Sequence, residues 1–146
     1  MFERILYPTD FSHIAKKALG YIKKLKDAGA KEVIVLHVID EREIENVSQH
    51  AGRHMNVQEV EKRWNEYTKQ QVKEIEGELK ESGFDVRVRI ERGIPFTEIL
   101  RVEEEQGVSI VVLGSHGKSL VKEMLLGSVS ENVIRRSKKP VLVIKR

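Results

Sequence analysis

Two nearly continuous apolar runs constrain the fold of this chain more than any other feature of its sequence. The first covers Glu32–Ile39, where His37 is the only polar residue after Glu32, and the second covers Ile110–Leu113. A strand with one face in water alternates apolar and polar residues, whereas a strand covered on both faces does not. The runs therefore predict buried strands of a parallel sheet with helices on both faces.

Segments with helical spacing fill the intervals between the predicted strands. Strand and helix alternate from one end of the chain to the other, and 146 residues suit one ordinary domain. We therefore expect a single domain over residues 1–146: a doubly wound α/β fold with a five-stranded parallel sheet and right-handed crossovers. The strands are expected over Arg4–Tyr7, Glu32–Ile39, Phe84–Ile90, Ile110–Leu113 and Val141–Ile144.

Local signals mark where several helices begin and end. Ser12 suits an N-cap, Pro95 suits the first turn of a helix, and Gly29 and Gly107 suit helix ends. The strand at Phe84–Ile90 alternates apolar and polar residues, which indicates a half-buried strand near an edge of the sheet.

The stretch from Asp40 to Asn56 is polar and loses any clear period. It is predicted to be a long loop that leads into a long amphipathic helix and could act as a lid. Trp64 and Tyr67 lie on the apolar stripe of that helix, which indicates a core or interface position.

Composition narrows the classes of function. The 26 basic residues are interspersed with 23 acidic ones and the net charge is +3, which gives little support to nucleic-acid binding. The chain has no cysteine, so disulfides, thiolate catalysis and cysteine metal sites are excluded. It shows no signal-peptide pattern and no apolar run of bilayer length, so we expect a soluble, cytoplasmic protein without a membrane partner.

Histidines give no convincing metal site. His50 and His54 are one helical turn apart, but no third ligand is identifiable, and we predict no metal site in the protein itself. His37 lies within an apolar run, where a hydrogen-bonded core histidine is more common than a ligand.

In doubly wound sheets, ligands bind beyond the carboxyl ends of the strands, near the point where strand order reverses. This rule selects three loops: Pro8–Ser12, Val38–Asp40 and the segment from Gly114 onward. The last of these reads Gly-Ser-His-Gly-Lys-Ser over residues 114–119 and follows a predicted buried strand. Glycines at positive φ would let its amides turn toward a phosphate. It is not a P-loop, since that motif would require glycine at Val112.

The spacing of three glycines extends this pattern. Gly114, Gly117 and Gly127-Ser128 form G-x2-G-x9-G-S, and further landmarks lie at residues 7–12, 37–38, 93–95 and 139–144. On these residues the whole chain resembles the ATP-binding branch of the universal stress protein family. The resemblance implies a Rossmann-like fold of the adenine nucleotide alpha hydrolase-like kind, binding ATP, ADP or AMP with Mg2+ held by the phosphates.

The resemblance also implies roles for particular residues. Asp10 matches an acidic residue near the ribose, and Pro8, Thr9 and Val38 match residues that line the adenine. Leu120 departs from the glycine that many relatives carry there. Residues that match the phosphate and ribose positions, or lie beside them, are Gly114, Ser115, His116, Gly117, Lys118, Ser119, Gly127, Ser128, Val129 and Ser130.

Simpler interpretations remain for some of these residues. Gly114 and Gly127 can be terminators of a strand and a helix, although their spacing favours a nucleotide site. Asp10 can be a turn or cap residue, and this role is compatible with ligand binding.

Three functions are open. The first is a nucleotide-binding regulatory module of the stress response with at most slow, Mg2+-dependent ATP hydrolysis, since no general base or arginine finger is evident. The alternative is a dimeric interaction protein that binds no nucleotide, and the third is a nucleotidyl-transfer enzyme. In relatives the last strand pairs across a two-fold axis, so we expect a homodimer through Val141–Ile144.

Overall fold

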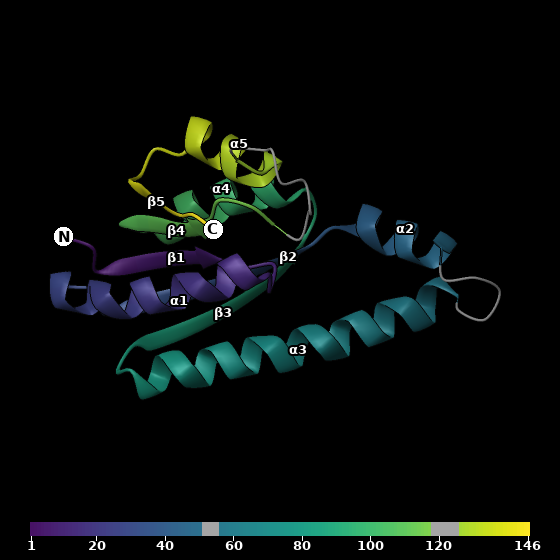
Figure 1. Ribbon diagram of the computed structural model, residues 1–146, viewed down its shortest axis with the longest axis horizontal. Coiled ribbons are helices and arrows are strands. Elements are labelled where there is room, and N and C mark those ends of the chain that lie inside the picture. The colour runs from purple at the N-terminus through teal and green to yellow at the C-terminus, as the bar shows by residue number, and fades with distance from the viewer. Residues whose placement is uncertain (51–55, 118–125) are drawn as a thin grey trace.

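The computed structural model of the protein describes residues 1–50, 56–117 and 126–146, without the side chains of residues 47–50. Strands and helices alternate through these residues (Figure 1). In chain order the elements are β1 (Arg4–Pro8), α1 (His13–Leu25), the short 3-10 helix η1 (Lys26–Ala28), β2 (Glu32–Ile39), α2 (Glu41–His50), α3 (Val57–Glu81), β3 (Asp85–Arg92), α4 (Pro95–Gln106), β4 (Ile110–Gly114), α5 (Ser128–Arg136) and β5 (Val141–Ile144).

The five strands form one parallel sheet in the order β3-β2-β1-β4-β5. The doubly wound fold predicted from the sequence is thereby confirmed. The chain moves outward from β1 through β2 to β3, then returns to the other side of β1 for β4. Strand order reverses between β1 and β4, and this places the carboxyl ends of β2, β1 and β4 side by side.

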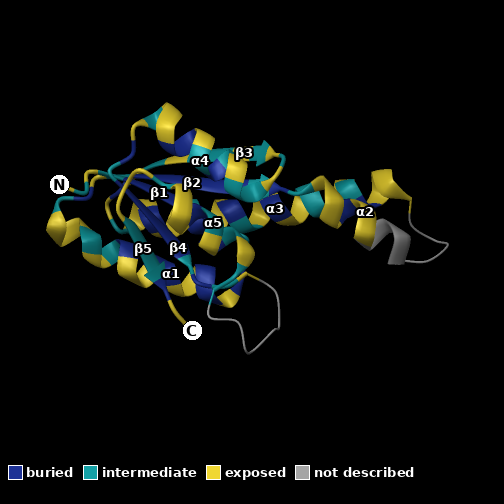
Figure 2. Ribbon diagram, turned by 90° about the horizontal axis from the view of Figure 1, so that it is seen from above, coloured by how far each residue is buried: buried dark blue, intermediate teal, exposed yellow. Residues whose placement is uncertain are grey.

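Helices cover both faces of the sheet, as the continuous apolar runs required. Alternate residues of β1 enter two separate cores: Ile5 and Tyr7 pack toward α1 and α3, while Leu6 packs toward α4 and α5. Figure 2 shows the central strands as almost wholly buried between these layers. Burial on both faces explains why β2 and β4 lack the alternation of polar and apolar residues seen in β3.

The predicted helix boundaries agree with the structure. The Ser12 hydroxyl accepts a hydrogen bond from the N–H of Ala15 at 3.2 Å and caps α1. Gly29 ends η1, which directly follows α1, with φ of 100°. Pro95 opens α4, and Gly107 ends it with φ of 57°. These left-handed φ values explain why glycine stands at the end of η1 and at the end of α4.

The loop predicted over Asp40–Asn56 is wrong, because α2 occupies much of it. The Asp40 carboxylate accepts a hydrogen bond from the N–H of Arg42 at 3.0 Å, as an N-cap does. Ile44 is the buried anchor of α2 and packs with Ile39 and Val60. Ile44 is the only apolar residue among residues 41–46, and a single apolar residue gives no visible helical period.

Helix α2 and the first half of α3 extend past the carboxyl end of the sheet (Figures 1 and 2). Trp64 of α3 packs against the same small cluster as Ile44 of α2, so α2 and α3 pack against each other. Among the described residues, no helix has both the length and the apolar character needed to cross a bilayer.

Candidate functional site

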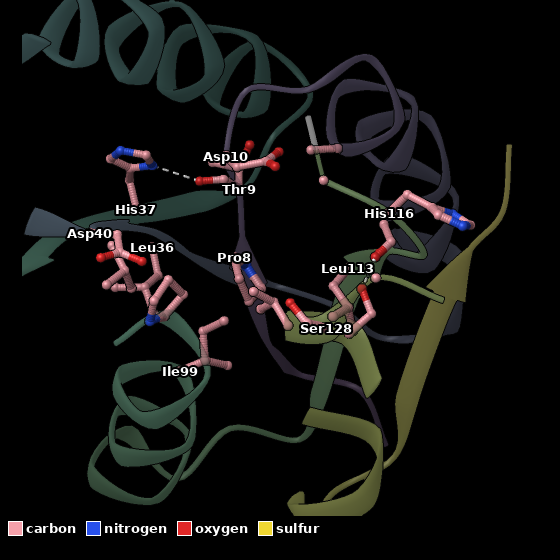
Figure 3. A pocket seen from close by; sticks show the side chains of 18 of the residues that line it. Pro8, Thr9, Asp10, Leu36, His37, Asp40, Ile99, Leu113, His116 and Ser128 are labelled. Carbon is pink, nitrogen blue, oxygen red and sulfur yellow. Dashed lines mark hydrogen bonds between the residues drawn. The ribbon is translucent and has the colours of Figure 1, made fainter. Parts of the chain in front are cut away.

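A cavity of about 340 Å3 lies at the carboxyl ends of β1, β2 and β4 (Figure 3). Each of the three loops selected from the sequence contributes to its wall. The predicted site residues that line the cavity are Pro8, Thr9, Asp10, Val38, Gly114, His116, Gly117, Gly127, Ser128, Val129 and Ser130.

The loop after β1 is a tight turn built from its own polar groups. The Thr9 hydroxyl accepts from the N–H of Phe11 at 3.1 Å, and the Asp10 carboxylate accepts from the N–H of Ser12 at 2.9 Å. Phe11 has φ of 64°, a conformation uncommon outside glycine. Asp10 is therefore a turn residue that also faces the cavity, so the turn role expected for it is present in the structure.

His37, near the end of β2, contacts this turn through a hydrogen bond and a stacked ring. Its Nδ1 lies 2.8 Å from the carbonyl oxygen of Thr9, and its ring stacks on Phe11 at a centroid distance of 4.4 Å. The side chain is buried. The expectation of a hydrogen-bonded core histidine is confirmed, and the residue also forms part of the cavity wall.

Limited space, and not φ, explains glycine at positions 114 and 117 of the loop after β4. None of Gly114, Gly117 and Gly127 has a positive φ, so the prediction that positive φ orients this loop is wrong. A Cβ at Gly114 would lie 2.8 Å from a methyl group of Ile14, and one at Gly117 would lie 2.7 Å from Oδ2 of Asp10. A side chain at Gly114 would therefore have to displace Ile14 of α1, and one at Gly117 would have to displace the Asp10 carboxylate.

Helix α5 begins at the cavity wall. Gly127 is its N-cap, with φ of −72°, and its N–H donates to the carbonyl oxygen of Ser115 at 2.7 Å. Glycine has no side chain with which to accept a bond from the first-turn N–H groups. Ser128 and Val129 in that turn line the cavity, and the Ser130 hydroxyl donates to the carbonyl oxygen of Gly114 at 2.6 Å. The positive end of the helix dipole therefore faces the cavity.

Two predicted site residues, Ser115 and His116, contribute less to the wall, and two others lie outside the described residues. Ser115 is buried and is absent from the cavity wall; its N–H donates to the carbonyl oxygen of Ile144, and its hydroxyl lies 2.7 Å from Nδ1 of His116. The imidazole of His116 points away from Pro8 and Asp40 (Figure 3). Lys118 and Ser119 lie outside the described residues, as do His54 and Leu120.

The structure adds wall residues that were not named as site residues from the sequence. Asp40 and Glu43 come from the start of α2, and Trp64 comes from α3. Asp40 ends the Val38–Asp40 loop selected from the sequence, and its alternation with Leu36 and Val38 places it on the same face. The sequence did not indicate that Trp64 lies in the cavity wall, because its position on the apolar stripe of a helix indicates only a packing role. The other additions are Ala15, Leu36, His37, Pro95, Ile99 and Leu113.

The cavity is electrically polarised. The N-terminus of α5 supplies partial positive charge on one side, while Asp40 and Glu43 supply carboxylates near the end of β2. The Arg42 guanidinium hydrogen-bonds both oxygens of Asp40 and lowers the pKa of that carboxyl group, so Asp40 is ionised at neutral pH. Among the described residues, no group of three histidine, aspartate or glutamate side chains is placed to hold a metal ion.

Comparisons with known proteins identify the family. The sequence model of the universal stress protein family matches residues 1–145. Universal stress protein MJ0577 of Methanocaldococcus jannaschii is 47% identical over 100% of this chain and 96% of its own length. Its solved structure matches with a TM-score of 0.89, at 48% identity, and covers 100% of this chain and 97% of that one. Universal stress protein YxiE of Bacillus subtilis is 33% identical over 99% of this chain and 100% of its own length. This chain belongs to the universal stress protein family.

Proposed function

We propose that this protein binds ATP or a related adenine nucleotide in the cavity and acts as a regulatory module of the stress response. The observation that carries the proposal is the opening of α5 into the cavity through a glycine N-cap. Unpaired N–H groups at a helix N-terminus, together with the helix dipole, form a favourable site for phosphate.

The size and lining of the cavity suit a nucleotide. A volume of about 340 Å3 falls in the range of about 300–1,000 Å3 that small-molecule sites occupy. Pro8, Val38, Ile99 and Leu113 give apolar surface for a base, and Asp10 lies where a ribose hydroxyl can donate to it. Because Gly117 has no side chain, its backbone can lie close to the Asp10 carboxylate.

Two solved structures of the same fold add support. A universal stress protein in complex with cAMP shares 23% identity at a TM-score of 0.64. A universal stress protein family protein of Arabidopsis thaliana with AMP bound shares 17% identity at a TM-score of 0.66. At these identities the likeness is one of fold, and we extend nucleotide binding to this chain on the strength of its own cavity.

Hydrolysis, where it occurs, is slow in this proposal. In dedicated NTPases a positioned base and an arginine finger supply most of the acceleration. Within the described part of the wall, the His116 imidazole lies 2.7 Å from the Ser115 hydroxyl and points away from Pro8 and Asp40. Mg2+ would be held by phosphate oxygens, because it prefers to keep several waters and a few oxygen ligands.

The proposal includes a homodimer through β5. This strand is an edge of the sheet, and Val141, Leu142 and Val143 are all partly exposed. An apolar edge strand is a ready template for pairing with another chain.

The test is to identify nucleotide released from pure protein by mass spectrometry, then to titrate the nucleotide-free protein with ATP, ADP and AMP by calorimetry. Trp64 lies in the cavity wall and is the only tryptophan of the chain, so its fluorescence should change on binding. Absence of copurified nucleotide, of heat and of a fluorescence change would favour the interaction protein that binds no nucleotide.

A further inference from the structure

Asp40 lies where β2 meets α2, with its side chain at the cavity wall. Leu36, Val38 and Asp40 alternate along the chain, and all three line the cavity. In Figure 3, Asp40 is on the side of the cavity that holds Leu36 and His37, across from Ser128 at the start of α5. The carboxylate and the helix N-terminus therefore face the cavity from different sides.

The Asp40 carboxylate is held in place before any ligand arrives. Arg42 donates to Oδ1 from Nε at 2.9 Å and from its backbone N–H at 3.0 Å, and to Oδ2 from Nη2 at 2.8 Å. The Asp40 side chain is 12% exposed, whereas the Arg42 side chain is 68% exposed. The guanidinium thus lies on the solvent side of the carboxylate, and Oδ2 retains capacity for a further donor.

Charge and apolar surface together orient a nucleotide in this cavity. Phosphates are attracted to the N-terminus of α5, whereas the end of β2 carries the Arg42-paired carboxylate of Asp40 beside the apolar wall residues Leu36 and Val38. A base therefore fits better toward the end of β2 than phosphates do. An ionised carboxylate only accepts hydrogen bonds, so the part of the base that meets Asp40 must be a donor.

We propose that the Asp40 carboxylate accepts a hydrogen bond from the exocyclic amino group of the bound purine and thereby selects an amino-bearing base. This proposal rests on the nucleotide-binding function proposed above. Two other arrangements compete with it: Asp40 serves only as the N-cap of α2, or the carbonyl oxygen of Val38 accepts the amino group.

A cycle of one ligand change and one protein change separates these arrangements. The probes are ATP and purine riboside triphosphate, which has hydrogen in place of the amino group. The variant is Asp40→Ser, because serine caps a helix about as well as aspartate but cannot reach as far or carry charge. Glu45→Ser is the matched control, since Glu45 is an exposed carboxylate of the same helix and is not among the described wall residues.

Calorimetry should show that the wild type binds ATP about tenfold or more tightly than purine riboside triphosphate, as one hydrogen bond to a charged group provides. In Asp40→Ser this preference should fall to about threefold or less, while Glu45→Ser should keep it. Asp40→Asn, which retains the cap and the shape, should give an intermediate preference. Circular dichroism checks that α2 persists in each variant.

A full preference for ATP in Asp40→Ser would overturn the proposal and point to the Val38 carbonyl. Equal binding of the two probes by the wild type would also overturn it, yet would leave the nucleotide-binding function intact. Binding of neither probe would instead reject that function, and the selection by Asp40 with it.

Discussion

Oδ2 of Asp10 lies 2.7 Å from the position that a Cβ atom at Gly117 would occupy. Gly117→Ala must therefore displace the Asp10 carboxylate, which the N–H of Ser12 holds at 2.9 Å. Both residues line the cavity, so we expect ATP affinity to fall about tenfold or more. The free energy of unfolding should change by less than about 1 kcal/mol, because only the end of one side chain must move.

Calorimetry and denaturant unfolding measure these two effects, and Gly20→Ala is the matched control. A Cβ at Gly20 in α1 meets nothing within 4 Å, so this change should leave binding intact and stabilise the protein by up to about 1 kcal/mol. A folded Gly117→Ala protein with wild-type affinity would mean that the Asp10 carboxylate takes no part in binding.

Gly127→Val should abolish ATP binding or weaken it greatly. A Cβ there already lies 3.4–3.5 Å from backbone atoms of His116, Gly117 and Ser115, so the γ-methyl groups must project toward the ligand or the loop. With φ of −72°, backbone strain plays no part. Ser128→Ala removes one hydroxyl and should cost about 0.5–1.5 kcal/mol of binding free energy. Calorimetry beside circular dichroism compares the two, and a folded Gly127→Val protein that binds normally would place the ligand elsewhere.

Tyr7 predicts an alkaline loss of stability. Burial raises the pKa of Tyr7 well above its ordinary value near 10, and its hydroxyl donates to the carbonyl oxygen of Ala15. As pH rises above about 10, unfolded chains release this proton while folded chains keep it, so the free energy of unfolding falls. Tyr7→Phe should cost about 1 kcal/mol at pH 7, and this difference should shrink as pH passes 10.

Urea unfolding of both proteins at pH 8 and above pH 10 measures that change. Titration of lysines is common to the two proteins and cancels in the difference. A difference that stays constant with pH would show that Tyr7 titrates alike in the folded and unfolded chains.

Deletion of residues 140–146 should convert a dimer to monomer or aggregate, because it removes β5 and exposes β4 as the new edge. Light scattering at micromolar concentration measures the mass of both proteins. A monomeric wild type would reject pairing through β5.

How much of the fold the sequence could predict depends on what each element packs against. β2 and β4 were predictable because burial on both faces leaves continuous apolar runs. α2 was not, since over residues 41–46 only Ile44 is apolar, and the Asp40 cap is a single residue, so neither makes a repeating pattern.

The same reasoning separates the parts of the site. The loops that line the cavity followed from the topology of the sheet, which brings together the ends of β1, β2 and β4. The reason for glycine at positions 114 and 117 did not, because it depends on Ile14 and Asp10, which approach from another part of the chain. Trp64 is part of the wall because α3 extends past the sheet. The helical pattern predicted a long helix, but not where that helix lies relative to the sheet.

The two edges of the sheet have opposite characters. On β3, Arg89 pairs with Glu91 and Glu105, and Glu91 pairs in turn with Arg101 of α4. β5 carries four apolar residues and no charge. A further strand added beside β3 would have to disturb this network of ion pairs, whereas one added beside β5 would not. If two copies join through β5 as proposed, only β3 edges would remain, and we expect strand-by-strand growth of the sheet to stop at two chains.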